Sequence, residues 1–273
     1  TNKHFSLVMS GRAIWGAAHI GVLRYIEEKE ATPTDIVGCS AGAIVGAFYA
    51  FGHTSGDIFN KFEIFANRKK WVHYSKSDEY VTDFQKVRQI LKGVFGDKKM
   101  SDAKIPLKIV ATDYDTGEPK VFSEEFDNVH VVDAILSTMS IPGVFPHVTI
   151  DNKMYVDGFM SSNLPIEYSS NYFLSNIKIP GRKIVAVDLM SEKCWKLTEK
   201  HNYFFFGKLR NIITEAERAV YVMIHNQTKT KLKAVKNIVL LKPDIMNISL
   251  LHPKGWEKMV ELGYQEAIDK LSE

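Results

Sequence analysis

Short apolar runs alternate along the chain with longer segments in which apolar residues recur at helical spacing. The runs predict buried strands, and they lie at residues 5–10, 36–39, 107–112, 184–189 and 238–241. Between the first two runs, Ile20, Leu23 and Ile26 fall on one side of a predicted helix, which ends before Pro33. The order strand, helix, strand, helix predicts a parallel sheet with crossover helices.

The rest of the chain continues this mixed pattern. Ser55 and Thr82 are placed to cap two amphipathic helices. Further strands are predicted at residues 120–122 and in a hairpin over residues 148–156, and further helices over residues 129–140, 203–237 and 254–271. Because no repeat, linker or composition break divides the chain, we expect one α/β domain spanning residues 1–273.

One uncharged stretch, residues 36–56, invites comparison with a membrane span. Its apolar part, residues 41–52, is shorter than the roughly 20 residues that a span requires, so it predicts a buried helix. The chain opens on a strand-like run, without a signal-peptide pattern. We therefore expect a cytoplasmic protein without a transmembrane segment, for which peripheral contact with membranes remains an option.

Composition narrows the choice of partners. The two cysteines, Cys39 and Cys194, form no disulfide framework, which favours a reducing compartment. The chain has 35 Lys and Arg against 32 Asp and Glu, a net charge of +3 that is too even to indicate nucleic-acid binding. The oligomeric state stays open.

The sequence G-C-S-A-G at residues 38–42 lies between a predicted strand and a predicted helix. In a nucleophile elbow, this strand–turn–helix arrangement exposes a serine at a sharp turn, so the pattern nominates Ser40 as a nucleophile. Flanking glycines are needed because a side chain there collides with neighbouring backbone. The alternative is a turn of small residues that only lets the helix pack closely.

A serine nucleophile needs a base. The histidines that follow Ser40 include His147, His201, His225 and His252, and none lies in a predicted strand-end loop beside an acid. Asp157 ends a strand-like segment and is followed by Gly158, so it is the better candidate. The alternative for an Asp-Gly pair is a turn-capping aspartate.

Three ordered blocks resemble the patatin-like phospholipases: residues 10–23, the G-x-S-x-G at residues 38–42, and Asp157-Gly158. Residues 111–118, 140–146 and 163–165 match the connecting motifs. The resemblance implies a three-layer α/β/α sandwich with a central, mostly parallel sheet, and a dyad of Ser40 as nucleophile and Asp157 as base. It implies hydrolysis of lipid or phospholipid carboxylic esters through an acyl-enzyme, with no metal or cofactor. It also makes Gly16, Gly38, Gly42 and Gly158 supporting positions, and His19 a support for the first helix.

The loop after the first strand departs from the family pattern. Where the family has G-G-G-x-[RK]-G, residues 11–16 read G-R-A-I-W-G. The resemblance assigns the oxyanion hole to the backbone N–H groups of Gly11, Arg12 and Ala13. Arg12 fits a positive φ poorly and brings bulk to the mouth of the site, so we expect weakened hydrolysis. Two alternatives stay open: a catalytically impaired patatin-fold protein that binds lipid or a protein partner, and an acyl transferase.

Two further features allow a lipid-facing interpretation. The aromatic cluster at residues 203–206 predicts either a flap that meets lipid or the buried start of a helix. Lysines on the same predicted helix either contact anionic phospholipid or form a solvated face; they are Lys229, Lys231, Lys233 and Lys236.

Overall fold

The computed structural model describes residues 4–67, 75–172, 182–190, 206–245 and 255–272. A single mixed sheet forms its centre, with the strand order β5-β6-β3-β2-β1-β7-β8 and with β4 paired to β3. Among the described residues five strands run parallel: β1 (His4–Met9), β2 (Asp35–Cys39), β3 (Leu107–Asp113), β7 (Arg182–Val187) and β8 (Ile238–Leu241). Three pair antiparallel beyond β3: β4 (Pro119–Phe122), β5 (Val148–Ile150) and β6 (Lys153–Asp157).

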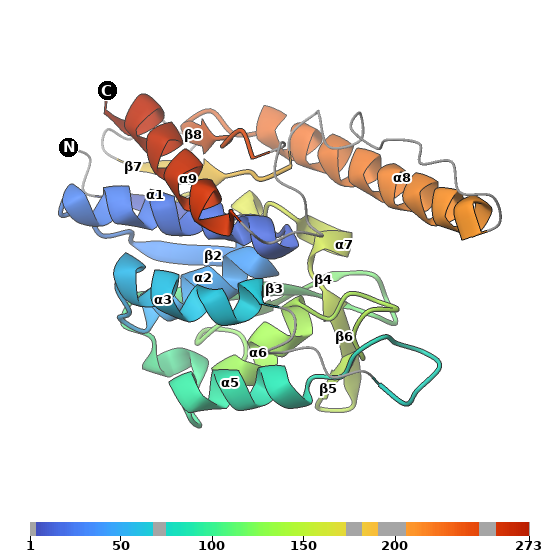
Figure 1. The fold of residues 1–273 in the computed structure, drawn as a ribbon. Coiled ribbons are helices and arrows are strands. Elements are labelled where there is room, and N and C mark those ends of the chain that lie inside the picture. Colours follow the sequence, from blue (N-terminus) through green and yellow to red (C-terminus); the bar gives the residue numbers. More distant parts are fainter. Residues whose placement is uncertain (1–3, 68–74, 173–181, 191–205, 246–254, 273) are drawn as a thin grey trace.

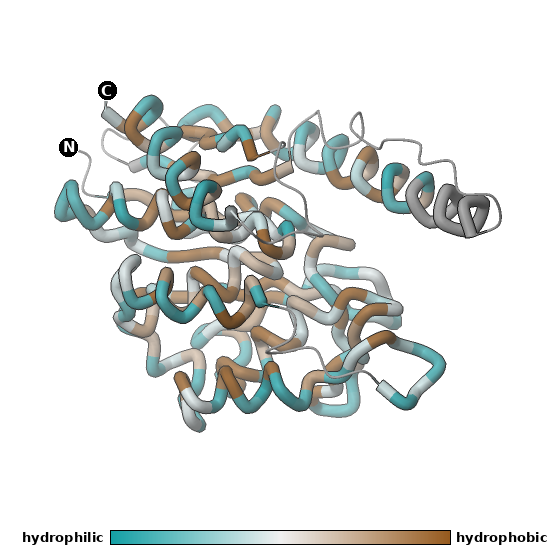
Figure 2. Tube along the Cα trace, in the orientation of Figure 1, coloured by the Kyte–Doolittle hydropathy of each residue, from teal (hydrophilic) through white to brown (hydrophobic). Residues whose placement is uncertain are grey.

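Alternation along the strands divides the core into two layers. Leu7 and Met9 of β1 face one layer, whereas Val8 faces the other. The helices that cover the first face are α1 (Ala17–Glu28), α2 (Ala41–Ala50), α6 (Val131–Thr138) and α9 (Trp256–Leu271), with α3 (Ser55–Ala66) and α5 (Gln85–Phe95) packed outside them. In Figure 2 these outer helices alternate between hydrophobic and hydrophilic along their length, as helices with one buried face do.

The second face has a thinner cover. Val8, Val37 and Val110 pack there against Leu164 and Ile166, which lie around the short helix η3 (Ile166–Tyr168), and against residues at the end of α8. The helix α8 (Phe206–Lys233) extends beyond the body of the molecule in Figure 1. Helices on both faces of a mostly parallel sheet confirm the predicted α/β sandwich.

Most predicted elements are present, but two caps were assigned to the wrong residue. Thr54, rather than Ser55, caps α3 in a reciprocal capping box with Asp57. Ser55 instead hydrogen-bonds Glu27 of α1 through its backbone N–H (2.8 Å) and its hydroxyl. Phe84 occupies the cap position of α5 without a side-chain hydrogen bond, so Thr82 is not its cap.

Of the predicted lysine face, Lys229, Lys233 and Lys236 are exposed. Lys231 is not part of a solvated face, because its ammonium donates to the Ser162 hydroxyl (2.6 Å) and pairs with Glu167. Cys194, His201, His252 and the aromatic residues 203–205 lie outside the described residues. Within the described ranges, no helix has the length and hydropathy of a membrane span.

The sheet brings the two central motifs together at β3. Cys39, at the end of β2, pairs with Val110, and Asp157, at the end of β6, pairs with the next residue, Ala111. The turn after β2 therefore meets the end of β6, although the two lie 117 positions apart in sequence.

Candidate active site

Ser40 occupies a strained turn between β2 and α2. Its φ of 48° and ψ of −121° lie in a region that residues other than glycine rarely adopt. Both predicted glycines are required by close packing: a Cβ on Gly38 would lie 2.5 Å from the Ala43 Cα, and one on Gly42 would lie 2.3 Å from the Met9 carbonyl oxygen. The observed turn is the predicted strand–turn–helix elbow.

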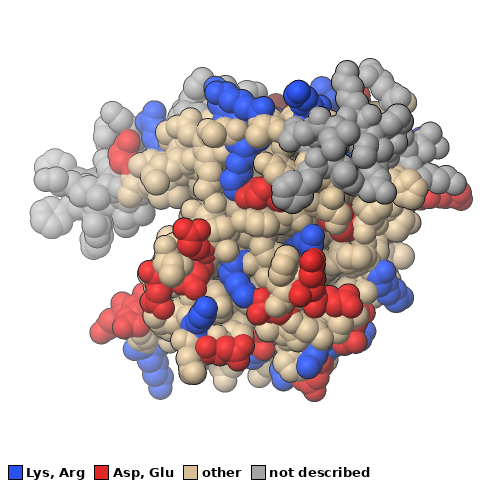
Figure 3. All heavy atoms as spheres, turned by 180° about the vertical axis from the view of Figure 1, so that it is seen from behind, with Lys and Arg blue, Asp and Glu red and all other residues tan. Residues whose placement is uncertain are grey.

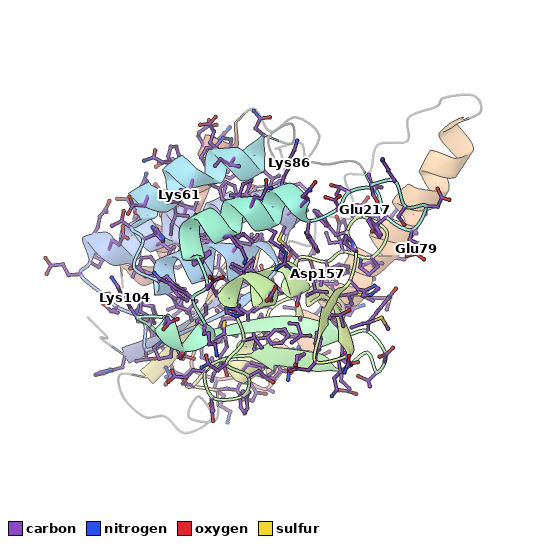
Figure 4. The ribbon with its side chains drawn as sticks, turned by 90° about the horizontal axis from the view of Figure 1, so that it is seen from below. Lys61, Glu79, Lys86, Lys104, Asp157 and Glu217 are labelled. Carbon is purple, nitrogen blue, oxygen red and sulfur yellow. The ribbon has the colours of Figure 1, made fainter. Side chains whose placement is uncertain are left out.

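The Ser40 hydroxyl donates a hydrogen bond to Asp157. The Ser40 Oγ lies 2.8 Å from Asp157 Oδ2, and the backbone N–H of Phe159 donates to Asp157 Oδ1 at 3.0 Å. Gly158 allows this approach, because a Cβ there would lie 2.1 Å from the Val110 carbonyl oxygen. Asp157 is fully buried, and Figure 4 shows it in the interior, away from the labelled surface charges.

Burial sets the ionisation of this pair. Desolvation raises the pKa of Asp157 from 3.8 to about 7, against the opposing effect of the hydrogen bonds from Phe159 and Ser40. A carboxyl group with this pKa is partly ionised at neutral pH and holds a transferred proton better than an ordinary aspartate does. Burial also raises the pKa of the Cys39 thiol, and Asp157 adds to this effect, so the thiol stays protonated. Asp157 is more than a turn-capping aspartate, because it accepts from both the local backbone and Ser40.

The described histidines lie elsewhere. His19 is buried and its Nε2 lies 2.8 Å from the Ser10 carbonyl oxygen, where desolvation lowers its pKa to about 4. A neutral His19 thus ties α1 to the end of β1, in agreement with the supporting role that the sequence indicates. His147 is exposed, and His225 lies on α8.

The loop after β1 lies directly against Ser40. A Cβ on Gly11 would lie 2.8 Å from the Ser40 Cβ, and one on Gly16 would lie 2.6 Å from the Ala41 Cβ. The Gly11 N–H donates to the backbone carbonyl of Asn163 at 3.3 Å, so this amide is engaged within the protein. Gly11 is therefore a weaker oxyanion donor than the sequence predicts, and the assignment of Arg12 and Ala13 to the oxyanion hole stays a prediction.

The positive φ that we expect at Arg12 is found at the next residue, Ala13. Arg12 has a φ of 172°, an extended conformation open to any residue, whereas Ala13 takes a φ of 43°. The Arg12 side chain is buried and donates from Nη1 to the Leu189 carbonyl oxygen at 2.5 Å. The positive φ expected at Arg12 is therefore absent, and its side chain has a packed site inside the protein.

Two threonines and an asparagine complete the site, and their parts in it were not predicted from the sequence. Thr138 Oγ1 accepts from the Ser40 N–H at 2.9 Å and donates to the Val110 carbonyl. Thr112 Oγ1 donates to the Asp157 carbonyl at 3.0 Å. Thr112 and Asn163 lie in the connecting motifs at residues 111–118 and 163–165, and Thr138 lies just before the motif at residues 140–146. Their place in or beside these ordered motifs is the feature of the sequence from which they could have been identified. Among the described residues no cluster of His, Cys, Asp and Glu side chains has a metal-binding arrangement.

Comparisons with known proteins find relatives of this chain. Two fungal relatives are named lysophospholipase NTE1: one from Meyerozyma guilliermondii is 25% identical over 97% of this chain, and one from Kluyveromyces lactis is 26% identical over 97%. The chain spans 19% of the length of each. A protein from Mycobacterium bovis, named as an uncharacterized NTE family protein, is 29% identical over 60% of this chain and 27% of its own length.

The fold also has a solved counterpart. VipD from Legionella pneumophila superposes with a TM-score of 0.54 over 99% of this chain and 66% of its own, at 12% identity, a likeness that concerns the fold alone. A family model described as patatin-like phospholipase matches residues 7–169. Because this match covers more than half of the 273 residues, the chain belongs to the patatin-like phospholipase family.

Proposed function

We propose that this chain is a serine lipid acyl hydrolase in which Ser40 is the nucleophile and Asp157 the base. The observation that carries the proposal is the 2.8 Å hydrogen bond from the Ser40 hydroxyl to a buried carboxylate whose pKa is about 7. A base with a pKa near the working pH combines a useful deprotonated fraction with a useful affinity for the proton. Membership of a family of lipid ester hydrolases supports the same reading.

The reaction follows from these positions. As Ser40 Oγ attacks the ester carbonyl carbon, its proton passes to Asp157 and the carbonyl oxygen becomes an oxyanion. The backbone N–H groups of Arg12 and Ala13 and the N-terminus of α2 stabilise that charge. Protonated Asp157 then gives its proton to the leaving alcohol, and the acyl-enzyme forms. Water, deprotonated by Asp157, attacks the acyl carbon, releases the fatty acid and returns the proton to Ser40.

Two observations favour hydrolysis over a binding role. The hydrogen bond from Ser40 to Asp157 is formed, and the Arg12 side chain holds the loop that departs from the family pattern in place rather than displacing it.

Helix α9, which lies beyond the matched residues, packs on α1 and β8, so we propose that residues 1–273 act as one domain.

A lysophospholipid is the substrate class we propose. The fungal relatives are named lysophospholipases, and they are about five times longer than this chain, so the assignment is made for the domain. Release of the acyl group to water distinguishes this activity from transfer to another alcohol. No cofactor enters the proposal, because each proton has a donor and an acceptor among Ser40, Asp157, water and the ester.

We further propose that one edge of the molecule meets the lipid interface from the cytoplasmic side. Large apolar side chains are exposed on the loops and helices that pack around the site: Val81, Tyr114, Val144, Met160, Val220 and Met223. Tyr114 follows the end of β3, Met160 lies in α7 (Phe159–Ser162) directly after Asp157, and α7 packs on α8. A lipid that reaches Ser40 has to leave its aggregate at such an apolar rim.

The test is release of fatty acid from micellar lysophosphatidylcholine by the purified chain. Wild type should release one fatty acid per glycerophosphocholine, with no acyl ester formed when a competing alcohol is present. Ser40→Ala and Asp157→Asn should lose this activity, whereas Ser101→Ala, which removes an exposed hydroxyl outside the site, should keep it. Turnover by Ser40→Ala at the wild-type rate would overturn the assignment.

A further inference from the structure

Arg12 is a buried cation in the loop that lies against Ser40. The residue is only 7% exposed, its guanidinium carbon lies 3.8 Å from the centre of the Trp15 ring, and Nη1 donates to the Leu189 carbonyl at 2.5 Å. Burying a guanidinium is costly unless hydrogen bonds and stacking replace its water. The arrangement therefore holds the side chain in one place, and with it the backbone from which it projects.

The acceptor of this bond is itself fixed to the same loop. The Leu189 N–H donates to the Ser10 hydroxyl at 2.9 Å, and the Ser10 N–H donates to the Val187 carbonyl at 3.1 Å. Ser10, Leu189 and Arg12 thus form a closed set of contacts between the end of β1 and the end of β7. Trp15 completes it: its backbone N–H donates to the Arg12 carbonyl at 3.1 Å, and its ring stacks against the guanidinium.

The backbone of the loop matches this anchoring. Glycine-rich loops reach the geometry of an oxyanion hole because glycine has few backbone restrictions. Ordering such a loop costs more conformational entropy than ordering one whose residues have side chains. Here Arg12 is extended and Ala13 adopts a φ of 43°, so two residues with side chains hold the turn. A side-chain anchor that removes alternative loop conformations keeps the N–H donors in place before the substrate arrives.

We propose that the Arg12 side chain is a positioning residue, which locks the oxyanion loop through its stack on Trp15 and its bond to Leu189. This inference rests on the proposed function and adds a residue to it. It reverses the expectation from the sequence: Arg12 supports the loop, and replacing it by the glycine that the family prefers costs activity. Tyr221 of α8, whose ring centre is 6.0 Å from the guanidinium carbon, covers the same group and couples it to that helix.

The test compares Arg12→Ala and Arg12→Gly with a matched control in which another stacked arginine is removed. Arg24 lies 3.7 Å from the Tyr264 ring centre and bonds Glu261 at 2.9 Å, on the α1–α9 surface. Both Arg12 variants should lose about 10²-fold in kcat, the effect of losing one oxyanion donor, with KM within about threefold of wild type. Arg24→Ala should keep the wild-type kcat.

Chemical rescue separates positioning from stability. Millimolar methylguanidinium should restore at least about tenfold of the rate lost in Arg12→Ala, since a free guanidinium can refill the site beside Trp15. It should restore nothing in Ser40→Ala. Arg12→Lys, which keeps the charge but lacks the planar stack, serves if the smaller variants do not fold, and it should lie between wild type and Arg12→Ala in kcat.

Three results would overturn the proposal: wild-type kcat in Arg12→Gly, wild-type kcat in Arg12→Lys, or a loss that methylguanidinium fails to restore in a folded Arg12→Ala. Failure of the proposed function has a different signature. In that case the wild type releases no fatty acid, or Ser40→Ala is as active as the wild type, whatever residue 12 is.

Discussion

The Asp157 carboxyl group is fully buried and yet has to be ionised to act as a base. Its pKa is about 7 in the folded chain, whereas the ordinary pKa of an exposed aspartate is 3.8. Between these two pH values the folded state binds more protons than the unfolded state, so the free energy of unfolding falls as the pH rises. Above pH 7 the full cost of the buried charge is present. The ionised carboxylate that catalysis requires therefore lowers the free energy of unfolding.

Asp157→Asn should therefore stabilise the chain while removing its activity. The neutral amide avoids the buried charge, so the unfolding temperature at pH 8 should rise above that of the wild type. At pH 5, where the wild-type carboxyl is already largely protonated, the gain should be much smaller. Thermal unfolding by circular dichroism at the two pH values measures both effects, and a lower unfolding temperature at pH 8 would show that the buried charge carries no such cost.

The same pKa predicts the pH dependence of turnover. Only deprotonated Asp157 accepts the Ser40 proton, so kcat/KM should fall about tenfold for each pH unit below about 7 and level off above it. Hydrolysis of a soluble p-nitrophenyl ester gives this profile without an interface. A profile that stays flat down to pH 5 would show that no group with this pKa is the base.

At the scale of elements, α1 and α9 cross at two glycines. A Cβ on Gly21 would lie 1.9 Å from the Val260 carbonyl oxygen, and one on Gly263 would lie 1.9 Å from the Ala18 carbonyl oxygen. Contacts this short involve backbone, which cannot move aside as a side chain can. The close crossing explains why the last helix can cover the first, and it depends on both positions.

Gly263→Ala should destabilise the chain by roughly 1–3 kcal/mol, because the added methyl group overpacks the crossing. Gly93→Ala is the matched control: Gly93 lies inside α5, nothing lies within 4 Å of its Cβ position, and alanine should stabilise that helix by about 1 kcal/mol. Urea unfolding of both variants measures the difference. An equal effect of the two substitutions would show that the helices do not meet as described.

The elements themselves were largely predictable, and the exceptions have physical causes. Strands buried on both faces are continuous apolar runs, so residues 36–39 and 107–112 were visible in the sequence. The cap of α3 was misplaced by one residue, because Thr54 and Ser55 both suit the position and only Asp57 decides between them. Ser40 and Asp157 followed from ordered motifs. The conformation of Arg12 did not, since Leu189, its hydrogen-bond partner, lies 177 residues away.

At the scale of the whole molecule, charge is uneven around the apolar rim. In the two loops that carry Val81 and Tyr114, residues 75–83 and 113–118, the acidic residues outnumber the basic ones: Asp78, Glu79, Asp83, Asp113, Asp115 and Glu118, against Lys76. The helix α8 is mixed, with Glu215 and Glu217 but also Arg218, Lys229, Lys231 and Lys233. Figure 4 shows Glu79 and Glu217 on the same side of the molecule, and in Figure 3 red side chains are spread over the lower half of the visible face. The negative loops of the rim favour zwitterionic over anionic lipid.

Binding to vesicles of phosphatidylcholine should therefore be at least as strong as binding to mixed vesicles that contain phosphatidylserine. Met223→Asp, at a side chain that is 70% exposed on α8, should weaken flotation with both. Phe126→Asp is the control, because Phe126 is 61% exposed but follows β4, which runs antiparallel to β3 and so ends away from the end of β3 where Tyr114 lies. Stronger binding to the anionic vesicles, or equal loss in both variants, would show that this rim is not the docking edge.

The proposed function depends above all on the activation of Ser40 by Asp157 for covalent chemistry. Labelling with a fluorophosphonate probe tests this without a choice of lipid, because the probe reacts readily only with an activated serine. We predict stoichiometric labelling of the wild type, mapped by mass spectrometry to Ser40, none in Ser40→Ala, and at least about 10²-fold slower labelling in Asp157→Asn. Rapid labelling of Asp157→Asn, or a modified residue other than Ser40, would refute the dyad.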